Sequence, residues 1–198
     1  MAVGKIVTGF SKPYVALYAA SSGTITYSSG QLLSQGVSVS GSADTADDNN
    51  FYADNVISET ESGVFTSGEL TLTVKGLEQD AEKLIMGLPT AGTDGFVKYD
   101  DDQAVPDVGV GFIVRYMQDG VTTYTPVIYP RCAFQFPNTE AATQEENIDW
   151  QTQELTATIK RAEDAKRTWK YVGGALATEA SAEDKIKTFF GISSGTTL

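Results

Sequence analysis

Residues 68–89 constrain the fold of this chain more than any other segment, because the spacing of their apolar residues changes halfway. Between residues 70 and 74, apolar and polar residues alternate, as expected of a strand with one buried face. Between residues 77 and 88, the apolar residues instead form one stripe of an α-helix. Gly87 can adopt the left-handed conformation that ends a helix, and Pro89 cannot continue one. The segment therefore predicts a strand followed by a short amphipathic helix that needs a sheet to pack on.

The rest of the chain is rich in strand patterns. Asp119-Gly120 lies between two β-rich runs and predicts a tight hairpin, because a type I′ turn needs positive φ at both central residues. Gly109 and Gly111 fall inside a strand, which indicates close backbone approach or strand coiling. A shift in the apolar phase predicts a β-bulge near residues 152–154. We expect strands at residues 14–20, 24–28, 32–40, 51–57, 63–74, 108–116, 121–136, 148–159 and 168–172.

A second helix is predicted at residues 181–190. Ser181 and Asp184 have the spacing of a capping box at its start. Two of its aromatic residues, Phe189 and Phe190, pack either into the core of the same chain or on a neighbouring molecule, where they are candidate subunit contacts. The apolar stripe of this helix consists of Ala182, Ile186, Phe189 and Phe190.

With 198 residues, the chain suits a single domain that can bury a sizeable core. Residues 1–10 are expected to form a first strand or an N-terminal arm, and the second helix belongs to a C-terminal helix and tail at residues 178–198. Residues 41–50 contain three aspartates but no large apolar and no basic residue. Such a segment has nothing to bury, so we expect a mobile acidic loop there.

The chain carries 26 acidic and 14 basic residues, a formal net charge of −12. No stripe of Lys and Arg is present that could grip nucleic acid phosphates. The acidic balance serves either solubility or the repulsion of another polyanion. No apolar run approaches the roughly 20 residues needed to cross a bilayer, so no membrane span is expected.

Residues that carry catalysis are missing from the sequence. It has no histidine, which removes the usual general base and the commonest metal ligand. It also has no nucleophile elbow, phosphate-binding loop or dinucleotide fingerprint. Asp44, Asp47 and Asp48 could offer oxygen ligands to calcium, but their spacing does not fit an EF-hand. Cys132 lies in an apolar run and is expected to be inert. We therefore expect no enzyme, no cofactor and no metal site.

Three groups of short strings, taken in order, point to a family. They are FYADN at residues 51–55; GELTLTV at 68–74 with LIMG at 84–87; and FQFP at 134–137 with EAAT at 140–143 and IDWQT at 148–152. Their order and spacing resemble the major tail protein, or tail-tube protein, of long-tailed siphophages that infect Gram-positive bacteria. The strings extend over most of residues 1–175.

This resemblance implies a mainly β fold of the α+β type, a β-sandwich or half-barrel with one flanking helix. It implies six copies per ring, with strands of all six closing into one barrel, and rings stacked into a tube through which double-stranded DNA passes. The expected partners are further copies of the chain and other tail proteins: the tape measure, the tail terminator and the distal tail protein. The protein would be made in the bacterial cytoplasm and reside in the virion tail.

Site residues follow from combining this resemblance with the charge pattern. Asp44, Asp47 and Asp48 are candidates for a loop between rings, since mobile segments can become ordered on binding. Asp54 and Glu59 are candidate lumen-facing acids, because a negative wall would repel DNA phosphates.

Two other functions stay open at this point. One is a β-sandwich that binds carbohydrate or a cell surface, which should be a stable monomer with aromatic residues on an exposed face. The other is a related tube protein of a contractile or secretion machine. A tube protein should polymerise, so the state of assembly separates it from the carbohydrate-binding module.

Overall fold

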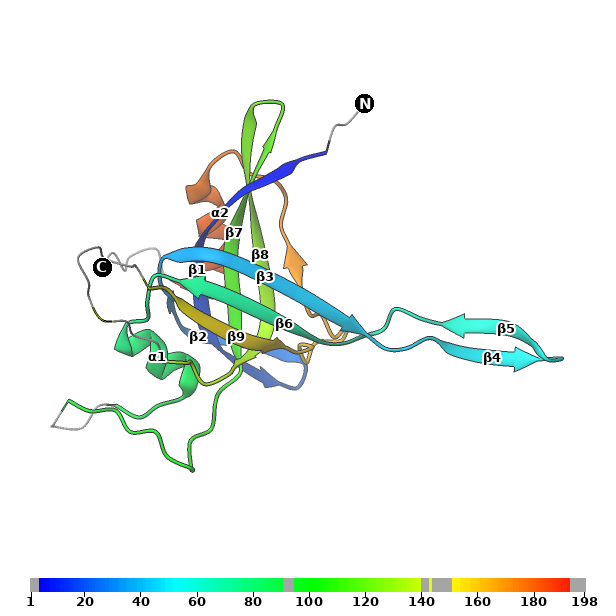
Figure 1. Cartoon of the computed structure of the whole chain (residues 1–198), viewed down its shortest axis with the longest axis horizontal. Helices are drawn as coiled ribbons and strands as arrows, with labels where there is room; N and C mark the ends of the chain where they lie inside the picture. The colour runs from blue at the N-terminus through cyan, green and yellow to red at the C-terminus, as the bar shows by residue number, and fades with distance from the viewer. Residues whose placement is uncertain (1–3, 91–94, 140–142, 144–150, 193–198) are drawn as a thin grey trace.

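The computed structural model describes residues 4–90, 95–139, 143 and 151–192, and it is mainly β with two helices (Figure 1). A large antiparallel sheet forms the body of the molecule, and a two-stranded hairpin protrudes from it. The expected combination of a mainly β fold with a flanking helix is therefore confirmed. The strands are β1 (Ile6–Ser21), β2 (Thr24–Leu32), β3 (Gly36–Thr45), β4 (Asn49–Ala53), β5 (Val56–Glu61), β6 (Phe65–Val74), β7 (Val108–Gln118), β8 (Val121–Phe134), β9 (Gln153–Ile159) and β10 (Tyr171–Val172), and the helices are α1 (Gln79–Met86) and α2 (Glu179–Phe189).

The main sheet bends so that β3, β6 and β9 cross over β1 and β7 (Figure 1). Its strand order is β2-β1-β7-β8-β9-β6-β3, and β10 adds to β8. The long strand β8 serves both halves, since Val127 and Ile128 pair with β10 whereas Cys132, Ala133 and Phe134 pair with β9. The end strands β2 and β3 do not pair with each other, so the sheet does not close into a barrel within one chain.

The core lies between the two halves of the bent sheet. Val15 of β1, Phe112 of β7 and Tyr129 of β8 belong to the same buried cluster as Leu72 of β6 and Leu155 of β9. Strand β6 buries every second residue along its C-terminal half, which confirms the period of two read from the sequence. Each fully buried side chain of this size stabilises the fold by about 1.5–3 kcal/mol.

Helix α1 covers one end of this core with its apolar stripe. Ala81, Ile85 and Met86 are buried, and Gly87 ends the helix with φ of 67°. The predicted helix and its glycine stop are confirmed, although the helix begins at Gln79 rather than at residue 77. Met86 is a buried residue that the predicted stripe did not include.

Helix α2 packs on the outer face of the same sheet. Ala182, Ile186 and Phe190 form a second cluster with Tyr14 of β1 and other residues of β1, β7 and β8. The predicted capping box is wrong, because the helix starts earlier: Thr178 is the N-cap, and its Oγ1 accepts a hydrogen bond from the backbone N–H of Ser181.

Two glycines in β7 leave room for the aromatic end of α2. A Cβ at Gly109 would lie 2.6 Å from the ring of Phe190, and a Cβ at Gly111 would lie 2.9 Å from it. The two glycines are therefore explained by the close approach of a side chain, the ring of Phe190, to the backbone of β7. Phe190 is 1% exposed and belongs to the core of its own chain, so of the two alternatives for this residue the structure shows the first, and it is not a surface available to another subunit.

The region around residues 41–50 differs most from the prediction. Strand β3 continues to Thr45 and pairs with β6 along its length, and β4 begins at Asn49. The expected mobile acidic loop is therefore wrong: only residues 46–48 separate two strands. Residues 51–57 do not form one strand either. Asp54 and Asn55 have φ of 48° and 63°, so the chain reverses there into a hairpin.

Other boundaries shift by smaller amounts. Asp119-Gly120 forms the predicted hairpin turn, with φ of 50° and 77°. Residues 32–40 are divided between β2 and β3, β8 ends at Phe134, and β10 has two residues. Strand β9 pairs with β6 from Gln153 without a shift in register. Ile148 and Trp150, on which the predicted bulge depends, lie outside the described residues.

Neither described helix is long and apolar enough to cross a membrane.

Candidate assembly surface

Residues 46–64 form a protruding segment that we call the arm (Figure 1). It consists of β4, β5, their turn and the short connections to β3 and β6. In the described part of the chain, β4 and β5 pair only with each other and with no strand of the main sheet. An isolated two-stranded hairpin is only marginally stable in water, so the arm is the element that most needs a partner.

The arm exposes large apolar side chains. Phe51, Tyr52, Val56 and Ile57 are between 53% and 64% exposed. None of them contributes to either buried cluster. Contiguous exposed apolar residues usually mark a surface that binds another molecule.

Acidic residues accompany these apolar side chains. The arm contains five Asp and Glu residues and no Lys or Arg. Phe51 pairs with Glu59 across the hairpin, and Asn49 pairs with Glu61. Directly paired residues share one face of a hairpin, so one face of the arm combines an aromatic ring with two carboxylates. The five acidic residues of the arm are Asp47, Asp48, Asp54, Glu59 and Glu61.

The root of the arm is fixed to the body by hydrogen bonds. The backbone N–H of Ala46 donates to the carbonyl of Val64 at 2.8 Å. Thr66 Oγ1 donates to the carbonyl of Asp44 at 3.1 Å, and Ser67 Oγ donates to its carboxylate at 3.2 Å. Asp44 therefore lies in the sheet at the root, where its carboxylate has a partner.

A stack of side chains covers the other side of the root. The rings of Phe65 and Trp169 are parallel, with centroids 4.6 Å apart. The guanidinium of Arg161 lies 5.9 Å from the centre of the Phe65 ring, close enough for a cation–π interaction. Because Phe65 is the first residue of β6, the stack ties the chain leaving the arm to the segment after β9.

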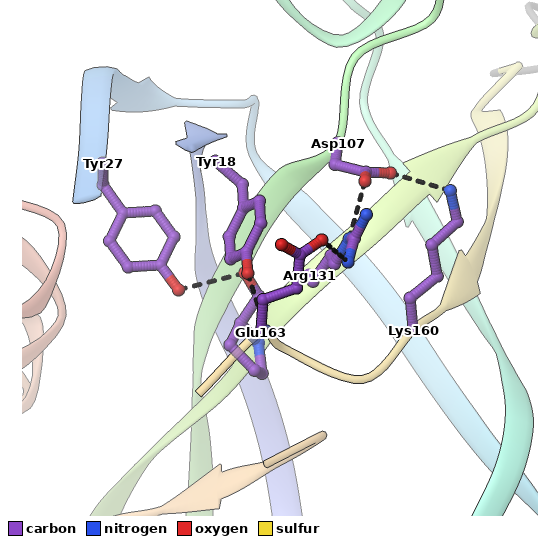
Figure 2. Close-up of polar contacts among 7 residues, drawn as sticks. Tyr18, Tyr27, Asp107, Arg131, Lys160 and Glu163 are labelled. Atoms are coloured by element: carbon purple, nitrogen blue, oxygen red, sulfur yellow. Dashed lines mark hydrogen bonds and ion pairs between the residues drawn. The ribbon is translucent and has the colours of Figure 1, made fainter. Parts of the chain in front are cut away.

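Asp107 connects several elements beside the root (Figure 2). Its carboxylate accepts hydrogen bonds from Arg131 Nε at 2.6 Å and Lys160 Nζ at 2.8 Å. Arg131 also donates to Glu163 at 2.7 Å, and the backbone N–H of Glu163 donates to the Tyr18 hydroxyl at 2.9 Å. Partial burial alone would raise the pKa of Asp107, but the hydrogen bonds from Lys160 and Arg131 lower it overall.

This charged cluster holds strands together and offers little to catalysis. The two strong hydrogen bonds keep Asp107 ionised and occupied. Burial raises the pKa of the neighbouring Cys132 thiol, which makes it a poor nucleophile. Among the described residues, no group of three or more Cys, Asp and Glu side chains could hold a metal ion.

A hollow of about 350 Å³ lies between β10 and α2. Pro126 and Ile128 of β8 line it together with Tyr171 and Val172 of β10, and Phe189 of α2 faces them. The rings of Tyr171 and Phe189 are 5.2 Å apart. We call this hollow the β10–α2 groove. Phe189 is half-buried here, so it remains accessible at a surface, unlike Phe190.

The structure brings most of the predicted site residues to the arm or its root. Asp44 lies at the end of β3, whereas Asp47 and Asp48 are exposed in the link to β4. Asp54 is in the turn at the tip, and Glu59 is on β5. Both candidate lumen-facing acids therefore lie on the arm and not on the main sheet.

Sequence reasoning did not recognise that the apolar residues of the arm lie together on an exposed hairpin. It assigned residues 51–57 to a single strand, because Asp54-Asn55 is a weaker turn signal than Asp-Gly or Asn-Gly. Asp and Asn adopt positive φ angles more readily than most other residues, and this preference was the signal that could have revealed the turn. Tyr171 and Val172 were predicted as part of a short strand, but nothing in the sequence indicated that they line a groove.

No protein-family model and no curated protein matches this chain.

Proposed function

We propose that this chain is a structural protein that polymerises, and that it builds a phage tail tube from stacked hexameric rings. The observation that carries the proposal is the arm, which presents Phe51, Tyr52, Val56 and Ile57 to solvent on a hairpin without other support. A hairpin of this kind is stabilised when a second molecule covers it.

The open sheet supports the same proposal. Strands β2 and β3 each pair on one side only in the described structure, and unpaired edges are sites for adding further strands. Closing such edges between subunits would join the bent sheets of several copies into one barrel. The resemblance to siphophage tail-tube proteins supplies the number of copies, the stacking and the passage of double-stranded DNA.

The negative charge also suits this function. A chain with a net charge of −12 would form a tube with little attraction for DNA phosphates, so DNA could slide through. The same proposal makes the chain a non-enzymatic component of the virion tail, with other tail proteins at both ends of the tube.

Assembly of the purified full-length chain tests this function. We expect rings or tubes of phage-tail width in negative-stain micrographs at high concentration, or with tail proteins as initiators. Replacing Phe51 and Ile57 by serine should abolish them without unfolding the chain, because both side chains lie outside the core. Val121→Ser is a matched control at another exposed apolar position, outside the arm and outside the edge strands β2 and β3.

The alternative of a carbohydrate-binding module predicts a different result. Such a protein would stay monomeric in sedimentation velocity under all these conditions and would bind glycans through Phe51 or Tyr52. A stable monomer, also in the presence of other tail proteins, would contradict the proposal of a tube.

A further inference from the structure

We propose that the β10–α2 groove is the receptor for the arm of a second copy of this chain. This inference rests on the proposed function, because it identifies the surface through which the subunits of the polymer bind each other. The arm and the groove are each incomplete as surfaces in the single chain, and their chemistry is complementary.

The groove has an apolar lining, and one of its sides is the unpaired edge of β10. Val172 is 61% exposed, although it is a β-branched residue in a strand. Strand β10 pairs with β8 on one side, and no other described strand pairs with its outer edge. An unpaired edge beside an apolar hollow suits an incoming strand, whose backbone can pair while its side chains enter the hollow.

The shape of the groove depends on a glycine. A Cβ at Gly173 would lie 2.6 Å from Cγ of Pro126. The backbone of Gly173 therefore approaches Pro126 closely, and its N–H donates to the carbonyl of Pro126 at 2.8 Å. This contact holds the end of β10 against β8 and leaves the space between β10 and α2 open.

The rim of the groove carries a basic side chain. Lys185 of α2 lines it, is exposed and has no ion-pair partner among the described residues. A turn that contains Lys166 and Arg167 lies next to Tyr171, whose hydroxyl is 3.5 Å from the Asp164 carboxylate in that turn.

The arm has the matching composition. Its Phe51 can enter an apolar hollow, while Glu59 and Glu61 on the same face can approach Lys185 at the rim. A central aromatic anchor with charged residues around it is the usual arrangement of a strong protein–protein contact. The arm of the same chain extends away from β10 and α2, so a second copy must supply it (Figure 1).

Cross-linking between two variants of the full chain tests the contact directly. A Ser58→Cys chain, which keeps Phe51 in place, is mixed with a Val172→Cys chain that carries a larger tag, and a short bis-maleimide joins cysteines that lie close together. Ser58 is exposed on β5 of the arm. Cys132 is buried and should not react. The matched control replaces Val172→Cys by Val121→Cys, a position of similar exposure in the turn region between β7 and β8.

We expect the Ser58→Cys and Val172→Cys pair to give about tenfold more mixed dimer than the control pair, because a bound arm holds its cysteine beside β10. Equal yields would overturn the groove as the receptor. A charge exchange provides a second measurement: Glu59→Lys with Glu61→Lys should prevent assembly, and Lys185→Glu should restore it. Tubes that form normally from the Glu59→Lys, Glu61→Lys chain would also overturn the proposal.

The two proposals fail in different ways. If wild-type tubes form while the cross-link is absent, the tube stands and the groove is wrong. If the specific cross-link forms but the wild-type chain never polymerises, the contact stands and the tube is wrong. Binding of double-stranded DNA to the rim, abolished by Lys185→Glu, together with equal cross-link yields, would assign the groove to nucleic acid instead.

Discussion

Single residues in this fold are chosen for the space they leave as well as for the contacts they make. A Cβ at Gly111 would lie 2.8 Å from Ile186 and 2.9 Å from Phe190, so Gly111→Ala should push α2 away from β7. We expect a loss of about 1–3 kcal/mol in the free energy of unfolding, measured by urea denaturation. Gly174→Ala is the control, since no atom lies within 4 Å of its Cβ position. An equal effect of both substitutions would contradict this account.

A second prediction at this scale concerns Glu183, which joins α2 to β1. Burial alone would raise its pKa, but hydrogen bonds from Lys12, Lys187 and Tyr14 lower it to about 2. Because the pKa is lower in the folded state, this carboxylate stabilises the fold above its ordinary pKa of about 4.3, and the contribution disappears as the pH falls towards 2.

The Glu183→Gln variant isolates the contribution of this carboxylate to stability. Between pH 5 and pH 7, Glu183→Gln should be less stable than the wild type by about 1–2 kcal/mol, a value reduced because Lys12 is partly exposed to solvent. The difference should shrink steadily as the pH falls from about 4.3 towards 2. A difference that is independent of pH would show that packing, and not charge, is responsible.

At the scale of whole elements, periodicity predicted the strands and helices that pack in the core and missed the exposed hairpin of the arm. The alternation in β6 and the stripe of α1 were recognisable because the core that they bury belongs to the same chain. The arm was not recognisable, because its apolar residues are exposed and do not follow the periodicity of residues that face a core. The acidic composition of residues 41–50 predicted a loop, but pairing with β6 outweighs that composition up to Thr45.

Removing the arm should leave the body intact. Thr45 already pairs with Phe65, so residues 46–64 can be replaced by an Asn-Gly turn. We expect this shortened chain to have a melting temperature within a few degrees of the wild type, because neither buried cluster loses a residue. It should remain monomeric in sedimentation velocity at concentrations where the wild type assembles. Unfolding of the shortened chain would mean that the arm supports the body.

At the scale of the whole molecule, two different surfaces that bind each other give head-to-tail assembly, which closes into rings or continues into filaments. If the arm binds the β10–α2 groove of a second copy, a chain without the arm can still accept an arm but cannot offer one. Added to the wild-type chain, it should therefore shorten the polymers in proportion to its share of the mixture, as measured by electron microscopy. Polymers of unchanged length would show that the shortened chain does not bind.

The stack of Trp169 on Phe65 gives the molecule a built-in optical signal. Trp169 lies against the first residue after the arm, and Trp150 is the only other tryptophan in the sequence. With Trp150 replaced by phenylalanine, the fluorescence of the chain would come from this one ring. Movement of the arm at its root should change the surroundings of that ring. Under the proposed assembly, its emission would therefore follow the binding of each new subunit in real time without an added dye.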